Sequence, residues 1–216
     1  MIGITRLVSR GPNVEVLDES HTVLRVLTGN SGPVRAVAYS PDGTTVATAS
    51  TDGTARIWDV ATGTTRTTLT GHTDLVYAVA YSPDGTTLAT ASNDGTVRIW
   101  EAATGTTRTT LTGHTSGVCA VAYAPDGITV VTAADDGTAR IWDAATGELL
   151  ATLIHLPGGG SAVLLPDGSY KLDGDPAGVL WWAVRLCRFE PGELDPYVGS
   201  LRRRPASAPL LAHYDR

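Results

Sequence analysis

The chain has 216 residues and a formal net charge of −6 at pH 7, with a pI of about 5.2. This length is enough for one good-sized domain. The acidic balance excludes non-specific binding to nucleic acid or an anionic membrane, because both need a basic face, so we expect neither partner. No apolar run approaches the ~20 residues of a membrane helix, and the N-terminus lacks a signal-peptide pattern.

The two cysteines, Cys119 and Cys187, are single and far apart in the sequence. They form neither a CxxC metal motif nor a disulfide framework. We therefore expect no metal site, no cofactor and a cytoplasmic location.

Residues 1–28 predict strands without a complete repeat. Asn13–Asp18 alternates between apolar and polar side chains, which favours a strand, and His21–Leu27 follows as a second one. Met1–Val8 is interpreted as the remnant of a third strand.

From residue 29 onward the chain repeats itself. Trp58, Trp100 and Trp142 follow one another at intervals of 42 residues, and residues 61–73 are identical to residues 103–115. Turns with proline or glycine divide each repeat into four predicted strands, because proline presets φ and glycine accepts a positive φ. In the middle copy the strands are 76–82, 87–92, 96–101 and 107–112.

Each repeat has glycine–histidine or its equivalent near the start and a tryptophan–acid pair near the end, for example Gly113–His114 and Trp142–Asp143. In this respect the chain resembles the WD-repeat β-propeller family, whose period is ~40–45 residues. The resemblance implies an all-β fold with blades of four antiparallel strands, here about four to five blade units. The expected units are an N-terminal partial blade (1–28), three WD repeats (29–70, 71–112 and 113–154), a divergent terminal blade (155–199) and a tail (200–216).

The divergent terminal blade keeps parts of the pattern. Its expected strands are 161–165, 169–172 and 179–184, from the innermost outward. The segment also resembles the closing stretch of long bacterial WD-repeat proteins, especially those of actinomycetes. In that group the propeller often follows a signalling, protease or nucleotide-hydrolysing domain.

The resemblance further implies a hydrogen-bonded chain of histidine, serine or threonine, aspartate and tryptophan inside each blade. The physical reason is that a buried imidazole and a buried indole N–H must find partners. We expect the aspartate to accept from the histidine and the serine to bridge the histidine to the indole. The expected members are His72, Ser92, Asp94 and Trp100; Ser50, Asp52 and Trp58, with Asn30 in place of histidine; His114, Asp136 and Trp142, with Ala134 in place of serine; and His155, Asp175 and Trp181 in the divergent blade.

A hydrolase triad is the competing interpretation of these histidine–serine–aspartate sets. A triad occurs once and opens to a cleft, whereas this set recurs in every repeat, and no GxSxG motif accompanies any of the serines. We therefore expect no catalytic residues.

Positions that differ between nearly identical repeats are candidates for partner recognition, since a fixed scaffold acquires specificity at its loops. The resemblance places two such sets at one end of the propeller, the face that usually receives peptides. Drift at solvent-exposed positions is the alternative explanation. The two sets are Arg35, Tyr77 and Cys119, and Thr51, Asn93 and Asp135.

The number of repeats leaves ring closure open. Propellers have ~4–8 blades, so the chain forms either a small closed ring or an open arc that self-associates to complete a ring; we favour the arc. The leading hypothesis for function is a non-enzymatic scaffold that presents one face to a protein or peptide. The alternatives are a C-terminal remnant of a longer signalling, NTPase or protease protein, and a propeller-based hydrolase.

Overall fold

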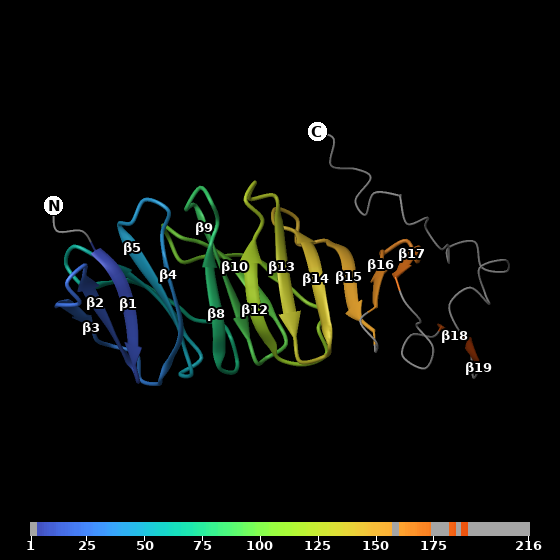
Figure 1. The fold of residues 1–216 in the computed structure, drawn as a ribbon, viewed down its shortest axis with the longest axis horizontal. Coiled ribbons are helices and arrows are strands. Elements are labelled where there is room, and N and C mark those ends of the chain that lie inside the picture. Colours follow the sequence, from blue (N-terminus) through green and yellow to red (C-terminus); the bar gives the residue numbers. More distant parts are fainter. Residues whose placement is uncertain (1–3, 157–159, 174–181, 185–186, 190–216) are drawn as a thin grey trace. The chain divides into compact units, whose positions relative to one another are not determined.

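A computed structural model describes residues 4–156, 160–173, 182–184 and 187–189 of the chain. Every regular element in these ranges is a β-strand, as the repeat pattern predicts (Figure 1). Among these residues there is no helix long and apolar enough to cross a lipid bilayer. The contacts divide the chain into two units, which are described separately: unit 1 holds residues 1–136 and 143–148, and unit 2 holds residues 137–142 and 149–216.

Unit 1 is a succession of antiparallel sheets. A three-stranded sheet, β1–β2–β3, comes first, two four-stranded sheets follow, β4–β5–β6–β7 and β8–β9–β10–β11, and β12 pairs with β13. These open antiparallel sheets confirm the predicted all-β fold class with blades of four strands. The strands are β1 (Ile4–Arg10), β2 (Asn13–Asp18), β3 (Val23–Leu27), β4 (Val34–Tyr39), β5 (Thr45–Ser50), β6 (Ala55–Asp59), β7 (Thr65–Leu69), β8 (Val76–Tyr81), β9 (Thr87–Ser92), β10 (Val97–Glu101), β11 (Thr107–Leu111), β12 (Val118–Tyr123) and β13 (Thr129–Ala134).

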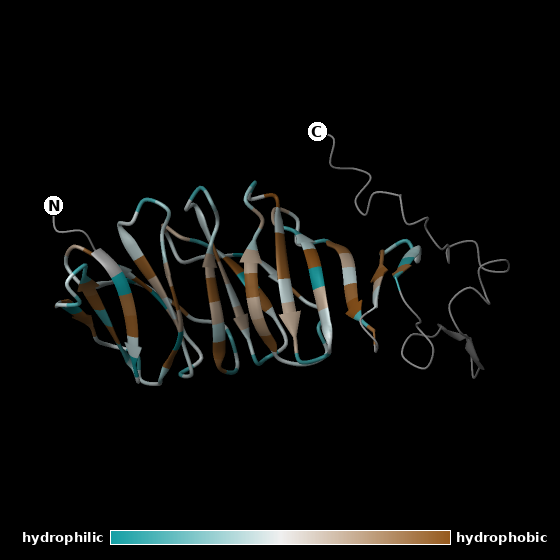
Figure 2. Ribbon diagram, in the orientation of Figure 1, coloured by the Kyte–Doolittle hydropathy of each residue, from teal (hydrophilic) through white to brown (hydrophobic). Residues whose placement is uncertain are grey.

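Consecutive sheets pack face to face, and this packing forms the core of unit 1. Ala47 and Ala49 of β5 lie against Val79 of β8 and Trp100 of β10, and all four side chains are buried. Because β5 and β9 are covered on both faces, every residue in them is buried. Figure 2 shows hydrophobic residues concentrated on the strands and hydrophilic residues in the turns.

The hairpin turns follow from residues that tolerate a positive φ. Gly63, Gly105 and Gly147 occupy the same turn of successive repeats, with φ between 72° and 77°. In the first sheet the corresponding turn contains His21, which has a φ of 62° and is the only residue other than glycine with a positive φ in the described chain. The backbone of this turn is therefore strained at His21.

Unit 2 differs from the expected divergent blade. Its described strands are β14 (Thr138–Asp143), β15 (Leu149–His155), β16 (Ser161–Leu164), β17 (Tyr170–Asp173), β18 (Trp182–Val184) and β19 (Cys187–Phe189). β14 pairs with β15, β15 with β16 and β16 with β17, all antiparallel.

The expectation that residues 161–165 begin a separate blade as its innermost strand is therefore wrong. β16 instead hydrogen-bonds to β15, which is the outermost strand of the third repeat. The reason is a hairpin closed by the Leu156 amide, which donates to the Gly160 carbonyl at 2.8 Å. This connection returns the chain along β15 and extends its sheet. The predicted roles of Asp175 and Trp181, and the tail 200–216, lie outside the described residues.

Candidate functional site

The hydrogen-bonded chain of the second repeat runs across β9 and β10. His72 Nδ1 lies 2.8 Å from Asp94 Oδ2, and His72 Nε2 lies 2.8 Å from Thr90 Oγ1. The Thr90 hydroxyl also accepts the indole N–H of Trp100 at 2.8 Å. The side chains of His72 and Asp94 are only 2% and 9% exposed, so this series of hydrogen bonds lies inside the blade.

The donors and acceptors of this chain fix the protonation of His72. The Trp100 indole can only donate, so it occupies a lone pair of the Thr90 oxygen. The single hydroxyl proton of Thr90 is then free to point at Nε2, while Nδ1–H donates to Asp94. A neutral imidazole protonated at Nδ1 therefore satisfies every group, and a second proton on Nε2 would displace the Thr90 hydrogen.

The pKa values of His72 and Asp94 are both lowered, although burial and hydrogen bonding oppose each other in each group. Burial lowers the pKa of His72 below 6.5, although its hydrogen bond to Asp94 opposes this shift. Burial by itself raises the pKa of Asp94, but hydrogen bonds from Thr96, His72 and the Thr73 amide together hold it at about 2. The pair is therefore a carboxylate and a neutral imidazole at neutral pH.

The expectation that Ser92 bridges His72 to Trp100 is wrong, because Thr90 does so. Ser92 Oγ instead donates to the Leu75 carbonyl at 2.8 Å and accepts the Asp94 amide at 3.1 Å. Thr90 and Ser92 lie on the same face of β9, two residues and therefore about 7 Å apart. In the pairing of β9 with β10, Trp100 lies opposite Leu88. Thr90 is two residues from Leu88 and Ser92 is four, so the Thr90 hydroxyl is the nearer one to the indole.

The first repeat builds the same chain with different residues. The Trp58 indole donates to Thr48 Oγ1 at 3.0 Å, and Thr48 Oγ1 lies 3.5 Å from Asn30 Oδ1. The amide nitrogen of Asn30 donates to the Pro12 carbonyl at 3.0 Å, so this chain is anchored in the preceding turn. Asp52 accepts the amide of Ser31. The Ser50 hydroxyl donates to the Gly32 carbonyl, which is again a backbone role.

The third repeat keeps the chain although it lacks the serine. His114 Nδ1 lies 2.8 Å from Asp136 Oδ2, and His114 Nε2 lies 2.7 Å from Thr132 Oγ1. The bridging hydroxyl is that of Thr132, so the alanine at position 134, where the second repeat has Ser92, does not interrupt the series of hydrogen bonds. Trp142, in unit 2, is 2% exposed.

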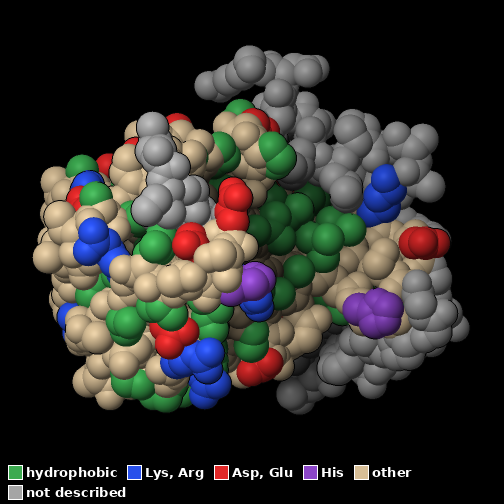
Figure 3. All heavy atoms as spheres, turned by 60° about the vertical axis from the view of Figure 1, so that its left-hand side comes forward, with side chains coloured by type: hydrophobic (Ala, Val, Ile, Leu, Met, Phe, Trp, Pro, Cys, Tyr) green, Lys and Arg blue, Asp and Glu red, His purple; other side chains and the backbone are tan. Residues whose placement is uncertain are grey.

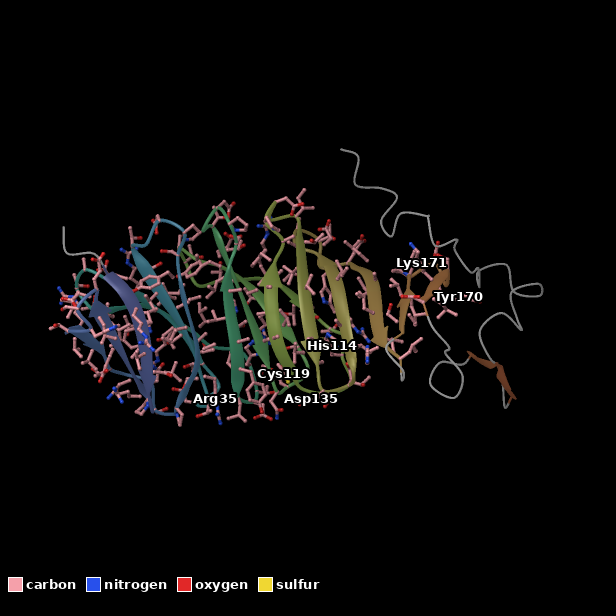
Figure 4. The ribbon with its side chains drawn as sticks, in the orientation of Figure 1. Arg35, His114, Cys119, Asp135, Tyr170 and Lys171 are labelled. Atoms are coloured by element: carbon pink, nitrogen blue, oxygen red, sulfur yellow. The ribbon has the colours of Figure 1, made fainter. Side chains whose placement is uncertain are left out.

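The variable residues lie at the end of unit 1 where β4, β8 and β12 begin and where β5, β9 and β13 end. Figure 4 shows Arg35, Cys119 and Asp135 along this end. We call the surface the variable face and define it by Arg35, Thr51, Tyr77, Asn93, Cys119 and Asp135.

Within each of two repeats the structure joins the two variable positions. Tyr77 donates from its hydroxyl to Asn93 Oδ1 at 3.4 Å, and Asn93 Nδ2 donates to Asp74 Oδ2 at 2.7 Å. A Cβ atom on Gly117 of the next repeat would lie 2.6 Å from Asn93 Oδ1, so any larger residue at position 117 would displace the Asn93 amide from its present place. Asp74 was missed by sequence reasoning, although its position also varies, reading Gly32 and Ser116 in the other repeats.

Cys119 and Asp135 form the equivalent pair in the third repeat. Cys119 Sγ donates to Asp135 Oδ1 at 3.1 Å. This hydrogen bond, together with partial burial, raises the pKa of the Cys119 thiol above 9.0. Arg35 of the first repeat is exposed, whereas Thr51 is half-buried and its amide donates to the Pro33 carbonyl.

The charged side chains of unit 1 are of both signs. Among the described residues no group of three or more histidines, cysteines and carboxylates could hold a metal ion. Figure 3 shows acidic and basic side chains interspersed on the face that it presents. The variable face combines Arg35 with the carboxylate Asp135, and Asp74 adjoins it through its hydrogen bond from Asn93.

Comparison with known proteins identifies the repeats. A family model described as "WD domain, G-beta repeat" matches residues 21–59, 63–101 and 105–143. No curated protein matches the chain at a significant level.

Proposed function

The chain belongs to the WD-repeat family, and we propose that it is a non-enzymatic scaffold that binds a protein or peptide through the variable face. WD repeats generally mediate protein interactions. The histidine–aspartate pairs do not offer a base, since both ring nitrogens of His72 are hydrogen-bonded inside the blade.

The observation that carries this proposal is the contrast between a constant interior and a variable rim. Thr48, Thr90 and Thr132 make the equivalent internal bond in all three repeats. At the rim the bonded pairs differ, with Tyr77–Asn93 in one repeat and Cys119–Asp135 in the next. A partner that spans these repeats would meet a different chemical group on each, including Arg35 and aromatic surface of the kind that anchors interfaces.

Site-specific photo-crosslinking in the native cell tests the proposal. A benzophenone amino acid is placed at Arg35 or Tyr77, and at Thr64, an exposed turn residue at the opposite end of unit 1, as the matched control. The expected result is a crosslinked protein common to Arg35 and Tyr77 and absent at Thr64. Equal products at all three positions, or none at the variable face, would overturn the proposal.

The exposed flank of the third repeat supports a further part of the proposal, self-association. Val131 of β13 is 39% exposed, whereas its counterparts Ala47 and Ala89 in the first two repeats are 0% exposed beneath the next sheet. A flank shaped to receive another blade of the same kind suits a second copy of this chain, and covering it would bury apolar surface worth about 25 cal/mol per Å².

Light scattering at micromolar concentration, with Val131→Glu as the variant, tests self-association. We expect a dimer or larger assembly that the glutamate dissociates, because a charge would be buried in the contact. If the wild-type chain is a monodisperse monomer, the self-association proposal is wrong, whereas the proposal that the variable face binds a partner is not affected.

A further inference from the structure

Two grooves lie at the end of unit 1 opposite the variable face, each between consecutive repeats. The first groove separates the sheets β4–β7 and β8–β11 and has a volume of about 250 Å³. The second groove separates β8–β11 from the third repeat and has a volume of about 350 Å³. Because the repeats are so similar, the first groove is an internal reference against which the second can be judged.

Both grooves share the same frame. In the first, the Tyr81 hydroxyl lies 2.9 Å from Thr45 Oγ1, and in the second the Tyr123 hydroxyl lies 2.9 Å from Thr87 Oγ1. These bonds tie each repeat to the one before it. The frame therefore does not distinguish the grooves, and any difference in binding must come from the turns around it.

The polar side chains of the turn at residues 40–45, which lines the first groove, hydrogen-bond to one another. It reads Ser40-Pro-Asp-Gly-Thr44-Thr45, and Asp42 Oδ1 accepts the Ser40 hydroxyl at 2.6 Å and the Thr44 amide and hydroxyl at 3.0 Å. The turn of the second repeat, around Asp84, makes the same bonds. In these two turns the carboxylate is occupied by its own neighbours.

The turn of the third repeat has lost both hydroxyl groups. It reads Ala124-Pro-Asp-Gly-Ile128-Thr129, so alanine and isoleucine replace the serine and the threonine that bond the aspartate. Within the part of the chain that the structure describes, Asp126 keeps one hydrogen bond, from the Ile128 amide at 2.9 Å. A carboxylate offers about four acceptor sites, and most of those on Asp126 therefore face solvent at the mouth of the second groove.

The same replacement places an aliphatic side chain beside that carboxylate. Ile128 is 46% exposed and lines the second groove together with Asp126 and Asp84. The cationic residue of this groove, Arg108, contacts Glu101 only at 3.8 Å, whereas Arg66 in the first groove is held by Asp59 at 2.6 Å. Three carboxylates, Asp84, Asp126 and Asp143, line the second groove against this single cation, so its lining is negative.

From these features we propose that the second groove is a separate binding site for a peptide segment of a partner protein. The segment carries a lysine or arginine next to an aliphatic residue. Its cation pairs with Asp126, and its aliphatic side chain packs on Ile128. The site is distinct from the variable face, so it does not depend on the function proposed for that face.

The test uses the full chain and the fluorescein-labelled peptide Gly-Leu-Lys-Leu-Gly, capped at its C-terminus, in fluorescence polarisation titrations. Two control peptides replace either the lysine by norleucine or both leucines by serine. We expect each change to weaken binding about fivefold, the scale of one exposed ion pair or a small apolar contact. Equal binding of the serine peptide would show attraction to the acidic chain as a whole and overturn the proposal.

Protein variants locate the site. The double variant Ala124→Ser with Ile128→Thr gives the third turn the sequence of the first two, which already fold, and should weaken binding about fivefold; Asp126→Asn should do the same. The converse variant, Ser82→Ala with Thr86→Ile, should create a second site of similar affinity in the first groove, where Asp84 takes the place that Asp126 has in the second. Unchanged binding by Asp126→Asn and by the double variant, with circular dichroism unaltered, would overturn the proposal.

Discussion

The hydroxyl oxygen of Thr90 lies 2.8 Å from the indole nitrogen of Trp100, and the same hydroxyl reaches His72. Thr90, which is 0% exposed, therefore joins the buried indole of Trp100 to the buried imidazole of His72.

The first prediction concerns this threonine. Thr90→Val keeps the shape of the side chain but leaves the indole N–H of Trp100 and Nε2 of His72 without partners, so it should cost about 1–3 kcal/mol of unfolding free energy. Ser92→Ala is the matched control and should cost less, about 0.5–1 kcal/mol, because Ala134 occupies this position in the third repeat. Urea unfolding measures both. A larger loss of unfolding free energy for Ser92→Ala than for Thr90→Val would indicate that Ser92, and not Thr90, links His72 to Trp100.

Stability should fall as the pH is lowered from neutrality. The unfolded chain protonates His72 near pH 6.5, whereas burial lowers this pKa in the folded state, so below about pH 6.5 the unfolded state binds more protons and is favoured. Asp94 adds a second loss as the pH falls from about 4 through its folded pKa of about 2. The unfolding free energy is measured against pH for the wild type and for His72→Asn, which introduces the residue that the first repeat has at this position, Asn30. The variant should lose the decline between pH 7 and 5, and an unchanged slope would contradict this assignment.

Three tyrosines at equivalent positions should respond differently to loss of the hydroxyl. Tyr81 and Tyr123 bond to a threonine of the preceding repeat at 2.9 Å, so replacement of either by phenylalanine should cost about 1 kcal/mol. The Tyr39 hydroxyl is buried without a partner among the described residues, and burial raises its pKa. Tyr39→Phe should therefore be neutral or stabilising in urea unfolding. Equal losses at all three positions would show that these hydroxyls do not couple the repeats.

Relief of backbone strain should stabilise the first sheet. His21 has a φ of 62° where Gly63 has 75° and Gly105 has 72°. His21→Gly should raise the unfolding free energy by about 0.5–1 kcal/mol, the cost of this conformation less the added entropy of the unfolded chain. Gly63→Ala is the converse control and should destabilise. Thermal unfolding of the three proteins provides the measurement, and a loss of stability in His21→Gly would contradict the prediction.

The hydrogen bond between Cys119 and Asp135 should protect the thiol. Since the Asp135 carboxylate raises the thiol pKa above 9.0, little of the reactive thiolate forms at pH 8. Asp135→Asn should therefore speed alkylation of Cys119 by iodoacetamide several-fold, in a Cys187→Ser background that leaves one thiol. An unchanged rate would show that the two side chains are not bonded in solution.

The sequence by itself determined the repeat, the strands and the turns of unit 1. Tryptophans spaced by 42 residues set the phase, and the predicted strand 87–92 coincides with β9. Such features are local, because the glycine that a turn requires and the alternation that a strand requires are read from a few neighbouring residues.

The tertiary structure decided what depends on register and on neighbours. Thr90 and Ser92 are both hydroxyl residues on one face of β9, and only the pairing of Trp100 with Leu88 selects Thr90. The sequence 155–165 is compatible with a new blade, but the bond from Leu156 to Gly160 turns it into a hairpin on β15. The exchange of threonine for isoleucine at position 128 is visible in the sequence. Its effect on Asp126 depends on hydrogen-bond partners and on a groove that exist only once the repeats have packed together.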